Sequence, residues 1–358
     1  MRRFDEVLCE NKHKRAGNRN LPVSRFFRVA KHWTKVGTCV RITVSGQGRK
    51  QVMNSKFTFY LPSSDGRSRI HGIQWVPSGD VKAVILISHG MIEHIGRYDD
   101  FAKAMNEAGI AVIGHDHLGH GLTARPGTLG QFAKENGAFY VLSDMEIVAA
   151  YARRQYPGVR CILLGHSMGS FFGRRFLTIH GDMVDGAIFM GTGSQPSFLL
   201  KLASYLVNKS VTRDGREHCD EKLHRLVLGS YNKKFEKGKT DHQWLSRDEE
   251  SNRGYEADPY CQFLFSNGAY ADFFQVMRDV KEEKDFDRIP KELPVLFLSG
   301  AMDPVGEKGK GVKRACDSLR RYGLTDVSIK LYPEARHELF HELNRDEVCR
   351  DVAAWVLR

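Results

Sequence analysis

From residue 81 onward, short apolar runs alternate with longer stretches that carry apolar residues at helical spacing. The run Val81–Ser88 is almost uninterrupted, which is typical of a strand buried on both faces of a sheet. Further runs predict strands at 111–114, 161–164, 187–190, 295–298 and 328–331. Helical spacing predicts helices at 98–108, 138–156, 171–179, 307–322 and 347–357. This alternation predicts an α/β fold with a mostly parallel sheet and helices on both of its faces.

The rest of the chain divides into segments around this pattern. Residues 57–61 and 70–75 predict two more strands, joined by a turn. Residues 193–262 are polar and helix-like and hold no strand of the buried type, so they predict a cap inserted over the sheet. We therefore expect a core formed by residues 53–192 and 263–358, with a cap at 193–262.

The net charge of +11 is concentrated at the N-terminus. Residues 1–52 hold 13 Lys and Arg against 3 Asp and Glu, whereas the remaining residues hold 41 basic and 40 acidic ones. The predicted folded part is therefore almost neutral, and we expect no nucleic-acid partner. The extension 1–52 is predicted to be disordered or to lie upstream of a true start at Met53. The alternative is a short amphipathic helix on an anionic membrane surface, formed by Phe26, Phe27, Ala30, Trp33 and Val36.

The cysteines indicate a reducing environment. The chain has seven of them, an odd number, and no two follow CxxC spacing. A disulfide framework is not expected, and we place the protein in the cytoplasm. The sequence shows neither an apolar run of signal-peptide length at its N-terminus nor a stretch of 18 apolar residues, so no membrane span is predicted.

The most specific motif is Gly165-His166-Ser167-Met168-Gly169. It follows the predicted strand 161–164 and precedes the predicted helix 171–179, which is the context of a nucleophile elbow. The two glycines leave room for a tight strand-to-helix turn that exposes the Ser167 hydroxyl. The start of the next helix favours negative charge that develops beside this hydroxyl. Ser167 is therefore our candidate nucleophile.

A serine hydroxyl needs a base that accepts its proton. Downstream, Asp303 follows the predicted strand 295–298 and His337 follows the predicted strand 328–331. Both lie just past the carboxyl ends of strands, where parallel sheets place their sites. Taken alone, Asp303 could be a turn residue before Pro304 and His337 could be a helix N-terminal residue. Their order after Ser167 favours an acid and a general base.

An acyl-transfer site also needs donors for the oxyanion. The backbone N–H of Met168, the residue after the nucleophile, is one candidate. The other is the N–H of Met91, in the loop after Val81–Ser88. In the same loop, His89 comes too early in the chain to be the base and is predicted to be structural.

Five motifs in order resemble those of monoacylglycerol lipases and lysophospholipase-like serine hydrolases, of the serine aminopeptidase S33 type. His89–Tyr98 resembles HGxxEHxxRY, Asp116–Thr123 resembles DxxGHGxS, and Gly165–Gly169 matches GHSMG. Asp303–Val305 and Arg336–Glu338 resemble the acid and histidine loops. The resemblance covers about residues 55–358. It departs at Ile92, where a small residue is common, and at Thr123, where Ser is usual.

This resemblance implies the α/β-hydrolase fold and a triad of Ser167, Asp303 and His337, with Met91 and Met168 as oxyanion donors. It implies cleavage of a monoacylglycerol, lysophospholipid or similar acyl ester, with no metal or organic cofactor. Contact with a membrane surface through the cap or the extension is a further expectation. Apolar cap residues line an acyl channel or form the core of the cap itself: Phe198, Leu199, Leu200, Leu202, Tyr205 and Leu206.

Four alternatives remain. His337–His341 matches HExxH, a zinc-binding helix motif, but Pro333 places His337 at the helix entrance, and Asn344 and Glu347 break the extended motif. His117, His120 and Asp116 have no confirming metal partner. A peptidase of the same fold would need an acidic group in the cap, such as Asp248, Glu249 or Glu250. A non-catalytic binding protein would not need the full set of triad and oxyanion residues.

Overall fold

The computed structural model describes residues 55–235 and 240–358. The predictions for residues 1–52, including the amphipathic stretch around Trp33, lie outside the described residues. Within the described part, no helix combines the length and apolarity that a membrane span requires.

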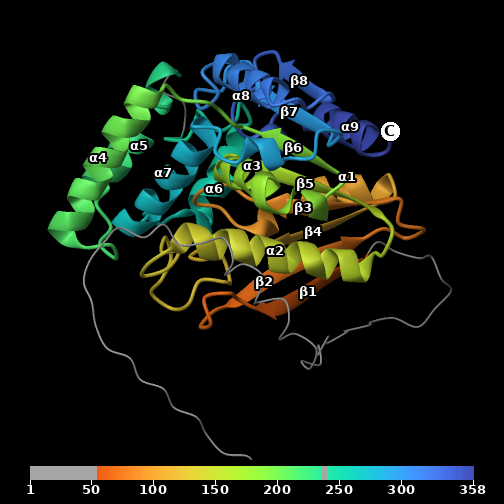
Figure 1. Ribbon diagram of the computed structural model, residues 1–358, viewed down its shortest axis with the longest axis horizontal. Helices are drawn as coiled ribbons and strands as arrows, with labels where there is room; N and C mark the ends of the chain where they lie inside the picture. The colour runs from red at the N-terminus through yellow and green to blue at the C-terminus, as the bar shows by residue number, and fades with distance from the viewer. Residues whose placement is uncertain (1–54, 236–239) are drawn as a thin grey trace, which may run out of the picture. The chain divides into compact units, whose positions relative to one another are not determined.

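Eight strands form one sheet in the order β1-β2-β4-β3-β5-β6-β7-β8 (Figure 1). Strands β3 to β8 run parallel, whereas β1 and β2 form an antiparallel hairpin and β2 also pairs antiparallel with β4. Every predicted strand is present. The bounds are β1 Ser55–Pro62, β2 Arg69–Val76, β3 Ala83–Ser88, β4 Ile110–His115, β5 Arg160–His166, β6 Gly186–Met190, β7 Val295–Gly300 and β8 Val327–Tyr332.

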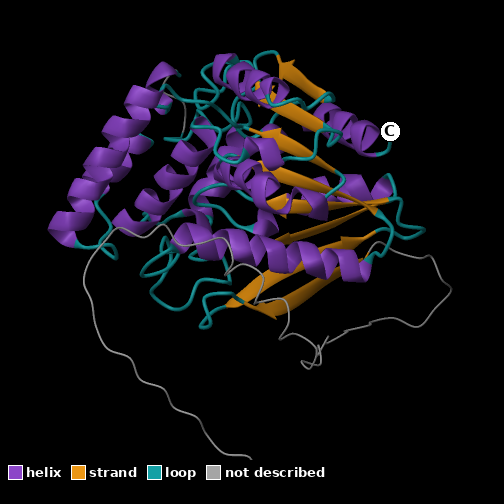
Figure 2. Ribbon diagram, viewed as in Figure 1, coloured by secondary structure: helices purple, strands orange, loops and turns teal. Residues whose placement is uncertain are grey.

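Helices cover both faces of this sheet (Figure 2). Alternate residues of β3 enter different cores: Val84 and Leu86 join one apolar cluster, and Ile85 and Ile87 join the other. The first cluster includes side chains of α2 (Gly137–Gln155), α3 (Met168–His180), α7 (Asn267–Lys281) and α8 (Lys310–Arg321). The second includes side chains of α1 (Asp99–Glu107) and α9 (Arg345–Val356). The predicted α/β fold with a mostly parallel, doubly covered sheet is confirmed.

The segment between β6 and α7 contains helices and, among its described residues, no strand. Its helices are α4 (Ser197–Asp214), α5 (Glu221–Val227) and α6 (Glu249–Ala257), and α4 packs against α7. This matches the predicted break in the strand–helix rhythm. That the segment acts as a cap stays a prediction.

Two predicted helix positions need correction. The helix expected over 307–322 begins at Lys310, because Glu307 and Lys308 have positive φ angles of 52° and 54°, which no α-helix contains. His337 does not stand at a helix entrance. It lies in an irregular loop, and only the 3-10 turn η8 (Leu339–His341) follows it.

Candidate active site

Ser167 is the single residue that connects β5 to α3, and it has a φ of 49° and a ψ of −118°. A non-glycine residue held in such a conformation is strained, and strain of this kind is typical of functional turns. The flanking glycines are required by space. A Cβ at Gly165 would lie 2.6 Å from the carbonyl oxygen of Gly169, and a Cβ at Gly169 would lie 2.0 Å from that of Ser88. The backbone therefore has the form of a nucleophile elbow.

Asp303 and His337 come together from the loops after β7 and β8. Nδ1 of His337 lies 3.1 Å from Oδ1 of Asp303, and the side chain of Asp303 is fully buried. The Asp303 oxygen also accepts a hydrogen bond from the N–H of Val305 at 2.8 Å. With its Nδ1 proton donated to Asp303, His337 keeps Nε2 available to accept another proton.

Ser167 and His337 line one cavity of about 600 Å³. The described contacts include no hydrogen bond between their side chains, as is common for catalytic pairs before a substrate binds. Met91 and Met168 line the same cavity. Met168 is the first residue of α3, so its N–H belongs to the turn whose amides lack carbonyl partners within the helix. The arrangement can support attack on a carbonyl and stabilise the resulting oxyanion.

The remaining wall of the cavity is mostly apolar. Of the six apolar residues predicted to line an acyl channel or to form the core of the cap, Leu199, Leu200, Leu202 and Leu206 line this cavity. Phe198 and Tyr205 do not, and their side chains are 68% and 63% exposed. Aromatic and aliphatic residues of α7 and of the loop before α6 complete the wall: Phe273, Phe274, Met277 and Trp244.

Carboxylates on the cavity wall already have basic partners. Glu338 accepts two hydrogen bonds from Arg97, at 2.7 and 2.8 Å, and Glu307 pairs with Arg314. The third carboxylate, Glu93, is held by His166 and Arg97. Asp248, Glu249 and Glu250 do not line the cavity, and Asp248 instead accepts N–H groups at the start of α6. The cavity therefore offers a neutral apolar chain a better environment than a substrate amine.

The pKa values of the Glu93–His166 pair favour its charged form. Burial opposes ionisation of Glu93, but His166 and Arg97 together hold its pKa well below the usual range. Burial also opposes the imidazolium of His166, but the Glu93 carboxylate raises the pKa of His166 above its ordinary value. A buried ion pair thus lies directly before Ser167 in the chain.

Burial lowers the pKa of four histidines at the end of β4 and in the loops after β3 and β4, namely His89, His115, His117 and His120. Burial lowers the pKa of His115 and His120 to about 3 each. Nε2 of His89 accepts a hydrogen bond from the backbone N–H of His117 at 3.0 Å, which agrees with the structural role predicted for His89. Asp116 accepts hydrogen bonds from the N–H groups of Ile95 and Leu122. Asp116 is thus occupied by hydrogen bonds, and among the described residues Asp116, His117 and His120 do not form a group with metal-ligand spacing.

These features match a known family. The sequence pattern of the serine aminopeptidase S33 hydrolases covers residues 79–344. The chain belongs to this family. The predicted resemblance is thereby confirmed.

Relatives of this S33 hydrolase include lipases and esterases. It is 28% identical over 304 residues to the monoglyceride lipase of Rattus norvegicus. The aligned region covers 79% of this chain and 84% of that lipase. It is 26% identical to the monoacylglycerol lipase of Mycolicibacterium smegmatis, and the aligned region covers 79% of this chain and 91% of that lipase. Its structure superposes with a TM-score of 0.78 on a carboxyl esterase from Bacillus coagulans, at 25% identity, covering 85% of this chain and 99% of the other.

The HExxH sequence of this S33 hydrolase does not form the helix that zinc binding requires. His337 and Glu338 precede η8, and Glu338 is paired with Arg97. Among the described residues, one group of three could hold a metal by spacing, namely His94, Asp258 and Cys261. Nε2 of His94 already lies 2.8 Å from Asp258, and burial raises the pKa of the Cys261 thiol. We interpret this group as a structural link between the loop after β3 and the turn before α7.

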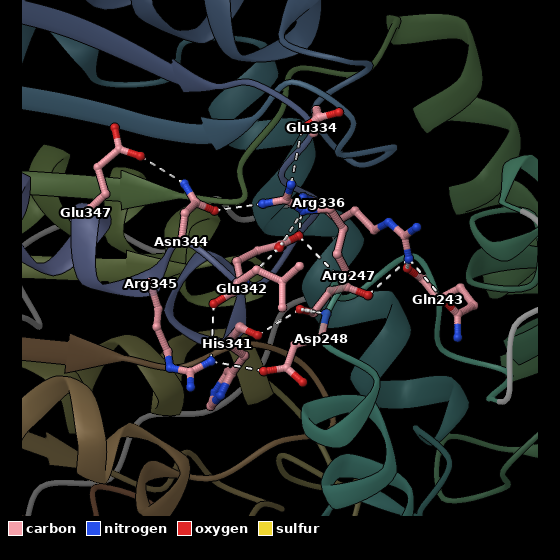
Figure 3. A network of polar contacts seen from close by, with 12 residues as sticks. Gln243, Arg247, Asp248, Glu334, Arg336, His341, Glu342, Asn344, Arg345 and Glu347 are labelled. Carbon is pink, nitrogen blue, oxygen red and sulfur yellow. Dashed lines mark hydrogen bonds and ion pairs between the residues drawn. The ribbon is translucent and has the colours of Figure 1, made fainter.

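Sequence reasoning missed the residues that hold His337 in place. The ring of Trp244 lies against His337, with centroids 4.9 Å apart, and the carbonyl oxygen of Trp244 accepts the N–H of His337 at 3.4 Å. Nearby, a polar network joins residues 243–248 to the loop that carries His337 (Figure 3). At its centre, the fully buried Glu342 accepts hydrogen bonds from Nε of Arg247 at 2.8 Å and from the N–H of Arg336 at 2.7 Å.

Proposed function

We propose that this S33 hydrolase cleaves carboxylic esters of the monoacylglycerol type through an acyl-enzyme. One observation carries the proposal. A strained elbow holds Ser167 at a mostly apolar cavity, and His337, oriented by the buried Asp303, lines that same cavity. A seryl ester intermediate formed there would leave the acyl chain among apolar side chains.

The reaction would proceed in two steps. His337 accepts the hydroxyl proton through Nε2 while the oxygen of Ser167 attacks the ester carbonyl, and Asp303 stabilises the imidazolium. The N–H groups of Met91 and Met168 stabilise the oxyanion. His337 then protonates the departing alcohol. In the second step His337 deprotonates water, which attacks the acyl-enzyme. The bond between the acyl carbon and the Ser167 oxygen breaks, His337 returns the proton to that oxygen, and the fatty acid is released.

The substrate class rests on the cavity and on the relatives. A volume of about 600 Å³, bounded by leucines of α4 and aromatic residues of α7, suits an acyl chain of medium or greater length. Relatives that cover 79% of this chain are named monoglyceride or monoacylglycerol lipases. We further propose that residues 193–262 form a cap whose leucines bind this chain, and that the protein acts in the cytoplasm.

Release of fatty acid from a chain-length series of monoacylglycerols tests the proposal. We expect activity in the wild type and a loss of about 10³-fold or more in kcat for Ser167→Ala. Ser204→Ala is the matched control, because this buried serine of α4 lies off the cavity wall and its hydroxyl has no hydrogen-bond partner. Equal activity in wild type and Ser167→Ala would refute the assignment of the nucleophile.

Peptide p-nitroanilides with a free N-terminus form the second arm. The paired state of the carboxylates on the cavity wall predicts much slower cleavage of these substrates than of monoacylglycerols. Faster cleavage of the peptides would overturn the ester assignment while leaving the serine mechanism in place.

A further inference from the structure

A second cavity of about 260 Å³ lies outside the candidate active site. None of the proposed catalytic or oxyanion residues lines it. Its polar wall is formed by α3, α8, the end of α7 and the segment that follows β6. The basic side chains on this wall are Arg174, Lys281, Arg314 and Arg321.

Arg174 is an unusually isolated buried cation. Only 3% of it is exposed, and it forms no ion pair with any described residue. One Nη2 hydrogen bond reaches the carbonyl oxygen of Gly193 at 2.9 Å, the guanidinium lies 4.6 Å from the ring centre of Phe171, and Nε has no partner. Burial lowers its pKa to about 9. A buried charge without a counter-charge is costly, so this site favours an anion.

Two cations of the cavity, Arg174 and Lys281, have no carboxylate partner among the described residues. Arg314 pairs with Glu307, and Arg321 pairs with Glu283. Asp317 lies 3.5 Å from Arg320, which is outside the cavity wall. Lys281 has no ion pair among the described residues. Its Nζ lies 3.4 Å from the hydroxyl of Ser194.

We propose that this cavity binds a phosphate group, either as inorganic phosphate or as a phosphomonoester. Arg174 can direct its planar N–H groups at two oxygens, Lys281 supplies a second positive charge, and the Ser194 hydroxyl can donate to a third oxygen. Two unpaired cations match a doubly charged oxyanion better than a carboxylate, which brings one charge. This site goes beyond the proposed ester hydrolysis.

The location of the cavity connects it with the active site. Arg174 and Arg314 donate to the carbonyl oxygens of Gly193 and Ser194, and the next residue, Gln195, lines the cavity that holds Ser167. This segment leads from β6 into α4. We therefore expect a bound phosphate to hold Arg174 in place and, through its contact with Gly193, to restrict the segment that precedes α4.

Titration calorimetry of the full chain with sodium phosphate at constant ionic strength tests the proposal. We expect a saturable site whose Kd weakens about tenfold in Lys281→Met, the loss expected for one charge-assisted contact. Lys313→Met is the matched control, because it removes one positive charge from an exposed residue of α8 that does not line the cavity. Since residues 1–52 are strongly basic, the difference between these two variants decides the result.

Three further arms complete the test. Tighter binding of glycerol 3-phosphate than of phosphate would assign the site to a phosphomonoester, and equal or weaker binding would assign it to inorganic phosphate. Arg174→Gln should abolish the site, and Lys281→Met keeps the proposal testable if that buried change prevents folding. Binding of acetate as tight as that of phosphate, equal losses in Lys281→Met and Lys313→Met, or no saturable binding would each overturn the proposal.

Discussion

Glu93 and His166 lie 2.8 Å apart from Oε1 to Nδ1, and this buried contact ties the loop after β3 to the residue before Ser167. The same oxygen accepts a hydrogen bond from the hydroxyl of Tyr98 at 3.1 Å and one from the N–H of Gly90. One carboxylate thus holds the loop of the proposed oxyanion donor Met91 against the elbow. Its removal is expected to affect folding and catalysis together.

Glu93→Gln should lower the free energy of unfolding by about 3 kcal/mol, because it leaves His166 without its buried counter-charge. Glu93 has a depressed folded pKa, so its contribution is complete above 4.5, the ordinary value, and is lost as pH falls through the folded pKa. His166 has a raised folded pKa, so its contribution is complete below 6.5 and is lost as pH rises through the folded pKa. The difference between wild type and variant should therefore be largest between pH 4.5 and 6.5.

Urea denaturation of both proteins from pH 3 to pH 9 measures this difference. A gap that stays constant across the whole range would show that the contact does not involve a charged pair.

Gly191→Ala should displace the proposed base. Gly191 has a φ of 59°, and a Cβ there would lie 2.9 Å from Cε1 of His337. A misplacement of His337 by about 1 Å is expected to lower kcat by about 10²-fold. Gly66→Ala is the control, because Gly66 has a similar φ of 69° with no atom within 4 Å of the added Cβ. Both variants should lose about 1 kcal/mol of stability, and only Gly191→Ala should lose activity. Equal kcat values for the two variants would contradict this role of Gly191.

Glu342→Gln should loosen the loop that carries His337. Its carboxylate is fully buried and joins Arg247 to the backbone of Arg336, one residue before the proposed base (Figure 3). We expect a loss of about 3 kcal/mol in the free energy of unfolding and a lower kcat. Arg345→Gln is the control from the same network, because its contact with Asp248 is half exposed and contributes about 0.5 kcal/mol. Urea denaturation and ester hydrolysis measure both effects, and similar losses in the two variants would argue against a central role for Glu342.

The exposed apolar side chains of α4 should contact lipid surfaces. Phe198 and Tyr205 are more than half exposed, and the neighbouring Leu202, 54% exposed, also lines the proposed acyl cavity. An apolar surface continuous with this cavity gives a lipid substrate a path from a membrane. Phe198→Ser with Tyr205→Ser should reduce sedimentation with phosphatidylcholine vesicles severalfold and leave hydrolysis of a soluble short-chain ester unchanged. Leu343→Ser, at an equally exposed leucine outside α4, should change neither result. Unchanged vesicle binding in the double variant would exclude α4 as the contact surface.

Local sequence was sufficient to predict the strands, the helices on both faces of the sheet and the turn at Ser167. Strand burial depends on runs such as 81–88, and the elbow depends on glycines within two residues of the serine. Ser167, Asp303 and His337 each follow a predicted strand, so their location at the carboxyl ends of strands was also predictable. These features were predictable because their causes lie within a few residues.

Only the tertiary structure decided which distant groups meet. The contacts of Glu93 with His166 and of Trp244 with His337 join residues 73 and 93 positions apart, and no local pattern specifies such pairs. The sequence HExxH had the spacing of a zinc helix, yet the pairing of Glu338 with Arg97 and the loop around His337 exclude that helix. The isolated charge of Arg174 also emerges only when α3, α7 and α8 pack together. Packing decides these features because burial and charge pairing depend on neighbours in space.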